Sequence, residues 1–157
     1  MALRTMPSEN YRATILEPGD RERWAELWRS YLAFYETELP DDVYAGTWER
    51  ILDPAGAIHA LGVRDGAGRL VGLTHYLLHA HAWSRADACY LQDLFVDADV
   101  RGRGYARALI DAVAAAARER GCSRLYWLTQ ESNATARRLY DAVAQNTGFI
   151  RYDFPLG

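Results

Sequence analysis

The stretch from Ala88 to Arg120 constrains the fold of this 157-residue chain most, because its hydrophobic pattern changes within it. Residues 88–96, ACYLQDLFV, form an apolar run of strand length. Residues 103–120 carry apolar side chains at helical spacing, and Gly121 is placed to end that helix. VRGRG, with two glycines, lies between them. The pattern predicts a buried strand, a tight turn and a helix.

The segments on either side predict a mixed sheet with helices on both of its faces. A hairpin is expected within residues 57–80, with its turn at residues 65–68, because alternating apolar residues flank two glycines. A crossover helix between two buried strands requires those strands to be parallel. Further strands are expected at 11–16, 124–129 and 148–154, and further helices at 20–38, 42–51 and 133–143. Residues 1–10 are expected to be a flexible N-terminus before a single domain over residues 11–157.

The composition excludes several classes of function. A net charge of -3 argues against a general affinity for nucleic acid, which depends on Lys and Arg contacts to phosphates. No apolar run approaches the roughly 18 residues that a membrane span needs, and no signal pattern is visible at the start. The two cysteines, Cys89 and Cys122, have no zinc-binding spacing. We therefore expect a cytoplasmic protein with buried thiols and no metal site.

The turn at residues 100–106 leaves two interpretations open on physical grounds. A turn with two glycines before a helix can direct several backbone N–H groups at one anion, with the helix dipole behind them. It can equally be a solvated basic turn. The spacing of Gly102 and Gly104 fits neither GxGxxG nor the P-loop, so neither of these nucleotide-binding fingerprints is present.

A family resemblance favours the anion-binding interpretation. LQDLFVDADVRGRGYARALI resembles the acetyl-CoA-binding motif of the GNAT superfamily of N-acetyltransferases, whose signature is met by Arg101, Gly104 and Ala106. ESNATARRLYDAV is similar to a second motif of that family through Asn133, Ala136 and Tyr140. The resemblance covers nearly the whole chain and implies an α/β (α+β) fold. That fold has a mixed, mostly antiparallel twisted sheet of six to seven strands and about four helices on both faces.

The resemblance also implies which residues hold the cofactor and move protons. Acetyl-CoA would lie along the strand end and in the turn, and Tyr140 would protonate the departing thiolate as general acid. The base stays open between Asp93, His75 and His79, because Gln92 occupies the place where some relatives carry a glutamate. The cofactor-binding residues implied are Leu94, Phe95, Val96, Arg101, Gly102, Arg103, Gly104, Tyr105, Ala106, Asn133, Ala136 and Tyr140.

The acceptor is expected to be a cationic amine. FYETELPDD holds four acidic residues and no basic one, in the region that borders the acceptor site in the family. With the aromatic residues close by, this segment would favour a small amine or a basic peptide, although a solvated acidic loop is an equal alternative. The substrate-site candidates are Tyr31, Tyr35, Glu36, Glu38 and His75.

The expected function is therefore transfer of an acetyl group from acetyl-CoA to a primary amine by direct attack in a ternary complex. That amine would belong to a small cationic compound, an amino acid or a protein. A narrower resemblance, to a small yeast and bacterial subgroup described as histone, polyamine or D-amino acid acetyltransferases, implies a homodimer. The alternative, from another class, is a catalytically silent acetyl-CoA-binding sensor.

Overall fold

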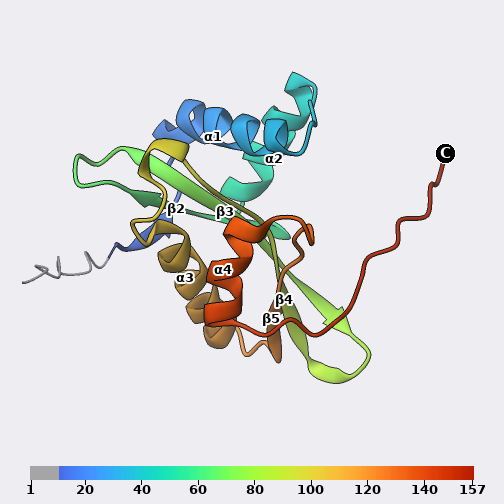
Figure 1. Ribbon diagram of the computed structural model, residues 1–157. Coiled ribbons are helices and arrows are strands. Elements are labelled where there is room, and N and C mark those ends of the chain that lie inside the picture. Colours follow the sequence, from blue (N-terminus) through green and yellow to red (C-terminus); the bar gives the residue numbers. More distant parts are fainter. Residues whose placement is uncertain (1–10) are drawn as a thin grey trace, which may run out of the picture. The chain divides into compact units, whose positions relative to one another are not determined.

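The computed structural model describes residues 11–157, and the predicted flexible segment 1–10 lies outside them. The chain divides into two compact units, Met1–Trp127 and Leu128–Gly157. Figure 1 shows the elements of both units. A single domain over residues 11–157 stays a prediction. None of the helices in the described range is long and apolar enough to cross a membrane.

The first unit holds a sheet of five strands in the order β1-β2-β3-β4-β5. Neighbouring strands are antiparallel except for β4 and β5, which are parallel as the predicted crossover requires. The strands are β1 (Ala13–Ile15), β2 (Ile58–Arg64), β3 (Leu70–His81), β4 (Ser84–Val96) and β5 (Arg124–Tyr126). The helices of this unit are α1 (Arg21–Phe34), α2 (Asp41–Leu52) and α3 (Tyr105–Glu119), with short 3-10 turns η1 (Pro18–Asp20) and η2 (Ala98–Val100).

Helices cover both faces of this sheet, which confirms the predicted layering. Figure 1 shows α1 and α2 on one side of the strands and α3 on the other. Two groups of buried side chains fill the two interfaces. Trp24 on α1 and Leu109 on α3 are both 0% exposed. Burial of one large apolar side chain contributes roughly 1.5–3 kcal/mol to folding, so each helix is fixed to the sheet by a few such residues.

The sheet has five strands among the described residues, and the expected number of six to seven is wrong. The predicted strand over 148–154 is absent. Residues 145–157 have no regular secondary structure and are exposed. A strand needs a neighbour to satisfy its backbone groups, and this segment has none in the ladders of the described chain. The predicted strand 124–129 is also shorter, since it ends at Tyr126.

The second unit contains α4 (Ala134–Val143). Its N-terminus is capped by Asn133, whose side-chain oxygen accepts a hydrogen bond from the Ala136 backbone N–H at 3.4 Å. The Asn133 amide also donates to Thr129 Oγ1 at 3.4 Å. Asn133 therefore has a clear local role in starting the helix, as its residue type predicts.

Candidate active site

The turn between β4 and α3 is built around two glycines in the left-handed region. Gly102 has φ 78° and Gly104 has φ 95°. Residues that carry a Cβ atom rarely adopt this backbone conformation, which explains why both positions hold glycine. A Cβ atom at either position would meet nothing within 4 Å, so the space in front of the turn is open. A ligand can therefore approach this backbone closely.

The N-terminus of α3 has the features of an anion site. Gly104 is its N-cap and provides no side chain to satisfy the first backbone N–H groups, and the first turn carries no acidic residue. A 15-residue helix adds its dipole, which is positive at this end. Arg101 and Arg103 are both exposed beside it. The turn thus fits a pyrophosphate, and its donors are backbone groups.

The side chain of Arg101 fixes the turn to the end of β4. Its Nε donates to the Val96 carbonyl oxygen at 3.0 Å, and its guanidinium lies 5.4 Å from the Phe95 ring centroid. This guanidinium therefore contacts the strand as well as adding positive charge to the turn. The ring of Tyr105 is buried against Tyr11, with centroids 3.9 Å apart, so only its backbone N–H is available to an anion in the turn.

The final residues of β4 extend beyond the pairing with β5. That parallel ladder runs only from Ala88 to Tyr90, opposite Arg124 to Tyr126. Leu91 and residues 93–96 are paired with β3 on one side and continue past the β5 ladder on the other. The edge of β4 that precedes the glycine turn is therefore unpaired in the described chain. An extended ligand arm fits such an edge, because it can pair as an added strand.

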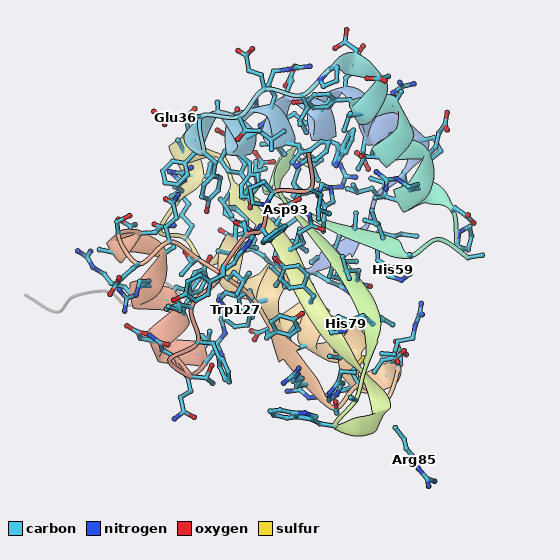
Figure 2. The ribbon with its side chains drawn as sticks, turned by 90° about the vertical axis from the view of Figure 1, so that its right-hand side faces the viewer. Glu36, His59, His79, Arg85, Asp93 and Trp127 are labelled. Atoms are coloured by element: carbon cyan, nitrogen blue, oxygen red, sulfur yellow. The ribbon has the colours of Figure 1, made fainter. Side chains whose placement is uncertain are left out.

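A buried carboxylate lies at the start of this free edge. Asp93 is 8% exposed and faces α1, whereas Gln92 is exposed, as strand alternation predicts. The β3–β4 register shifts here, since His75 pairs with Asp93 and Tyr76 with Leu91. This irregularity places Gln92 as the extra residue of a β-bulge. Figure 2 shows Asp93 near the middle of the sheet beneath α1.

Tyr35, the C-cap residue of α1, lies near Asp93, and Tyr31 of α1 contacts Tyr35. Burial raises the pKa of Tyr35, and the negative charge of Asp93 raises it further, while a hydrogen bond with Tyr31 acts in the opposite direction. The Tyr31 ring lies 5.0 Å from Tyr35 and 6.4 Å from Phe95. Tyr35 is therefore a neutral aromatic neighbour of Asp93, which suits an ammonium group.

The two predicted histidines already have partners for both ring nitrogens. His75 is 2% exposed and contacts Asp93 through Nδ1 and Trp24 through Nε2. His79 lies closer to the hairpin tip (Figure 2), where Nε2 contacts Tyr126 Oη at 2.8 Å and Nδ1 contacts the Ala80 carbonyl. Neither histidine has a free nitrogen for an acceptor amine. The sequence did not single out Trp24 as a polar partner.

The acidic segment divides into two structural roles. Asp41 and Asp42 occupy the first turn of α2, where negative charge stabilises a helix. Glu36 and Glu38 instead line a surface hollow of about 440 Å³ with Ala33 and Thr37. Glu36 has φ 54° and ends α1 in a Schellman motif, a place usually held by glycine. The left-handed backbone of Glu36 costs roughly 1–2 kcal/mol relative to the right-handed region. Backbone strain of this kind is found most often at functional sites.

In the second unit, α4 carries the other predicted cofactor residues. Ala136 and Tyr140 are four residues apart, so they share one face of the helix, and both are partly buried. Tyr140 also precedes the C-terminal turn, where its carbonyl accepts from the Ala144 N–H at 2.8 Å. Its role as general acid stays a prediction.

Known proteins resemble this chain along most of its length. Residues 21–144 match the model of the acetyltransferase (GNAT) family. The D-amino-acid N-acetyltransferase HPA3 of Saccharomyces cerevisiae is 36% identical over 148 residues, which are 94% of this chain and 92% of that protein. A ribosomal-protein-alanine N-acetyltransferase of Brucella melitensis has a TM-score of 0.74 at 29% identity, over 93% of this chain and 99% of its own.

An aminoglycoside N-acetyltransferase solved in complex with coenzyme A has the same fold. Its TM-score is 0.78 at 20% identity, and the match covers 97% of this chain and 99% of that one. At this identity the likeness concerns the fold alone.

Proposed function

The chain belongs to the acetyltransferase (GNAT) family, and on this premise we propose that it acetylates the primary amine of a small amino compound by direct attack in a ternary complex. Acetyl-CoA is the acetyl donor and, when bound, supplies the thioester carbonyl that the amine attacks. The observation that carries the proposal is the open glycine turn at the N-terminus of α3, joined to the free edge of β4 that begins at Asp93.

The residues of the turn would bind the pyrophosphate of acetyl-CoA. Backbone N–H groups from Arg101 to Ala106 are the donors, supported by the positive end of the α3 dipole. Leu94, Phe95 and Val96 would align the pantetheine arm along the β4 edge. The Arg101 side chain holds the glycine turn against the end of β4 through its hydrogen bond to the Val96 carbonyl. In this arrangement the acetyl group would lie toward the Asp93 end of the edge.

Asp93 would accept the proton that the amine must lose. An alkyl amine with a pKa near 10 is almost entirely protonated at pH 7. The Asp93 carboxylate, with Tyr35 close by, would attract this ammonium and accept its proton. Asp93 would take one proton from the ammonium, which frees the nitrogen lone pair for attack on the thioester carbonyl carbon. As the C–S bond breaks, Tyr140 would protonate the departing thiolate, and the second proton lost by the nitrogen would restore the Tyr140 hydroxyl.

The Tyr140→Phe variant tests the acid role. Loss of the hydroxyl is expected to lower kcat by roughly 10²–10⁴-fold with little change in acetyl-CoA affinity, because only proton delivery is removed. Tyr152, 87% exposed, provides the control, and Tyr152→Phe should leave kcat unchanged. Rates can be measured by coenzyme A release from pH 6 to 9. Equal rates for Tyr140→Phe and the unmodified enzyme would remove Tyr140 from the mechanism.

The acceptor we propose is a cationic amine or an amino acid. The name of the yeast relative specifies D-amino acids as its substrates. Candidate acceptors are therefore D-amino acids first, with the cationic D-lysine among them, and then spermidine and a basic peptide. Glu36 and Glu38 would attract a positively charged acceptor toward the surface hollow that they line. A panel that measures coenzyme A release together with the acetylated product tests this proposal. A preference for acidic amines over all the cationic ones would contradict it.

The charge of the two glutamates can be tested directly. Glu36→Gln with Glu38→Gln should raise KM for a cationic acceptor roughly 3- to 10-fold at low salt, because long-range attraction is lost. The difference should shrink near 1 M salt, where the screening length falls to about 3 Å. Glu22→Gln, an exposed change in the first turn of α1, is the matched control. A salt-independent rise in KM would indicate altered packing in place of lost charge attraction.

A homodimer is a further part of the proposal, supported by the C-terminal segment. Ile150, Tyr152, Phe154 and Leu156 alternate along it and are 75–96% exposed. Alternation of this kind suits a strand with one apolar face, and a second copy would cover it. Light scattering should give twice the chain mass for residues 1–157 and a monomer after removal of residues 148–157. A monomeric full chain would contradict the proposed dimer.

A further inference from the structure

His75 and Asp93 form a buried pair on the sheet face that α1 covers. They lie opposite each other in the β3–β4 ladder, so their side chains project to the same face. His75 Nδ1 and Asp93 Oδ2 are 2.8 Å apart, and the side chains are 3% and 11% exposed. A buried carboxylate at this distance is held in one orientation by its partner.

Trp24 determines where the His75 proton lies. Trp24 Nε1 and His75 Nε2 are 2.9 Å apart, with both residues buried. An indole N–H only donates, so Nε2 of His75 accepts and carries no proton. The neutral ring then carries its proton on Nδ1, where it donates to the Asp93 carboxylate. The indole of Trp28 packs edge-on to the same ring, with centroids 5.3 Å apart at 88°, and hinders its rotation.

We propose that Trp24 and His75 form a fixed hydrogen-bond relay that positions Asp93 for catalysis. In this proposal His75 is a positioning residue. It is neither the base nor a substrate contact, the two roles expected from the sequence. The relay occupies Oδ2 of Asp93 and leaves Oδ1 to receive the proton of the acceptor amine. The inference rests on the proposed function, in which Asp93 is the base.

The bond from Trp24 also fixes which ring nitrogen of His75 is the acceptor. Protonation at Nε2 would require the bond from Trp24 to break, because both groups would then be donors. The titratable groups around the pair are Tyr35 at the C-cap of α1, near Asp93, Tyr31 of α1, which contacts Tyr35, and Tyr44 on α2, which packs on Trp24. All three are tyrosines, so Asp93 is the anion beside His75.

Two substitutions of His75 separate positioning from packing. The amide nitrogen of Asn reaches the place of Nδ1, whereas that of Gln reaches the place of Nε2. His75→Asn therefore keeps a donor for Asp93, and His75→Gln loses it. We expect His75→Asn to stay within about 3-fold of the unmodified kcat, and His75→Gln to lose roughly 10–100-fold, the usual effect of removing such a supporting partner. KM for acetyl-CoA should be the same in both. Equal kcat values for the two variants would overturn the inference.

The tautomer can be observed without turnover. Nitrogen-15 NMR of the full chain, with the ring signals of His75 assigned through its backbone, should show its proton on Nδ1 and none on Nε2. A proton on Nε2 would overturn the relay even if the variants do not fold. In Trp24→Phe the proton should no longer be confined to Nδ1, because no donor then faces Nε2. Full activity of Asp93→Asn beside this tautomer would instead reject Asp93 as base and leave the hydrogen bonds intact.

Discussion

Replacing Gly104 by valine should lower acetyl-CoA affinity by roughly 100-fold or more. The position has φ 95°, which a β-branched side chain does not adopt, so the turn must rearrange. The new side chain would also occupy the open space from which the pyrophosphate approaches. Loss of about two charge-assisted hydrogen bonds, at roughly 1.5–3 kcal/mol each, accounts for this magnitude. Isothermal titration calorimetry with acetyl-CoA measures it.

Gly68→Val is the matched control for backbone strain. Gly68 has φ 83°, lies in the β2–β3 turn and also has open space at its Cβ position. Both variants should lose a similar free energy of unfolding, of about 1–2 kcal/mol, because each forces a side chain into the left-handed region. Only Gly104→Val should lose acetyl-CoA binding. Unchanged affinity in Gly104→Val would mean that the ligand does not approach this backbone.

Replacing Asp93 by asparagine should lower kcat by roughly 10²–10⁴-fold, the usual contribution of a general base. The asparagine oxygen can still accept the hydrogen bond from His75, so the local geometry is kept while the proton acceptor is lost. Affinity for acetyl-CoA should change little, because the pyrophosphate donors lie in the glycine turn. Steady-state rates against acceptor concentration and calorimetry with acetyl-CoA separate the two effects.

The neighbouring residue provides the control for Asp93. Gln92 is exposed and forms the extra residue of the β4 bulge, so Gln92→Ala removes a polar side chain from the same strand without touching the buried pair. We expect Gln92→Ala to retain kcat within about 3-fold, as surface changes away from special features have small effects. If Gln92→Ala were as slow as Asp93→Asn, the bulge geometry would be the source of both losses.

The sequence predicted the sheet, its covering helices and the glycine turn, because each depends on local pattern. The strand 88–96 and the helix 103–120 were expected from hydrophobic periodicity, and the ends of β4 and α3 lie within four residues of those bounds. The helix starts at Tyr105 because the left-handed Gly104 cannot be part of it. The first helix ends at Phe34, four residues early, because Glu36 adopts a positive φ that its residue type does not predict.

The rest could not be predicted, since it depends on contacts between distant residues. The polar role of Trp24 arises only because α1 places its indole N–H on His75, 51 residues further along. The pair of His75 and Asp93 depends on strand register, which a local pattern does not give. The alternating apolar segment at 148–154 predicted a strand, but no neighbouring strand in the described chain pairs with it. Pattern alone does not supply that partner.

The most direct test of the central claim is acetyl transfer by the purified chain. Coenzyme A release from acetyl-CoA should be measured with D-amino acids, spermidine and a basic peptide, alongside Gly104→Val and Asp93→Asn. We expect release with at least one amine, a matching gain of one acetyl group in that amine by mass spectrometry, and large losses in both variants for different reasons. Tight acetyl-CoA binding with no acetylated product from any amine would contradict it and favour a silent acetyl-CoA sensor.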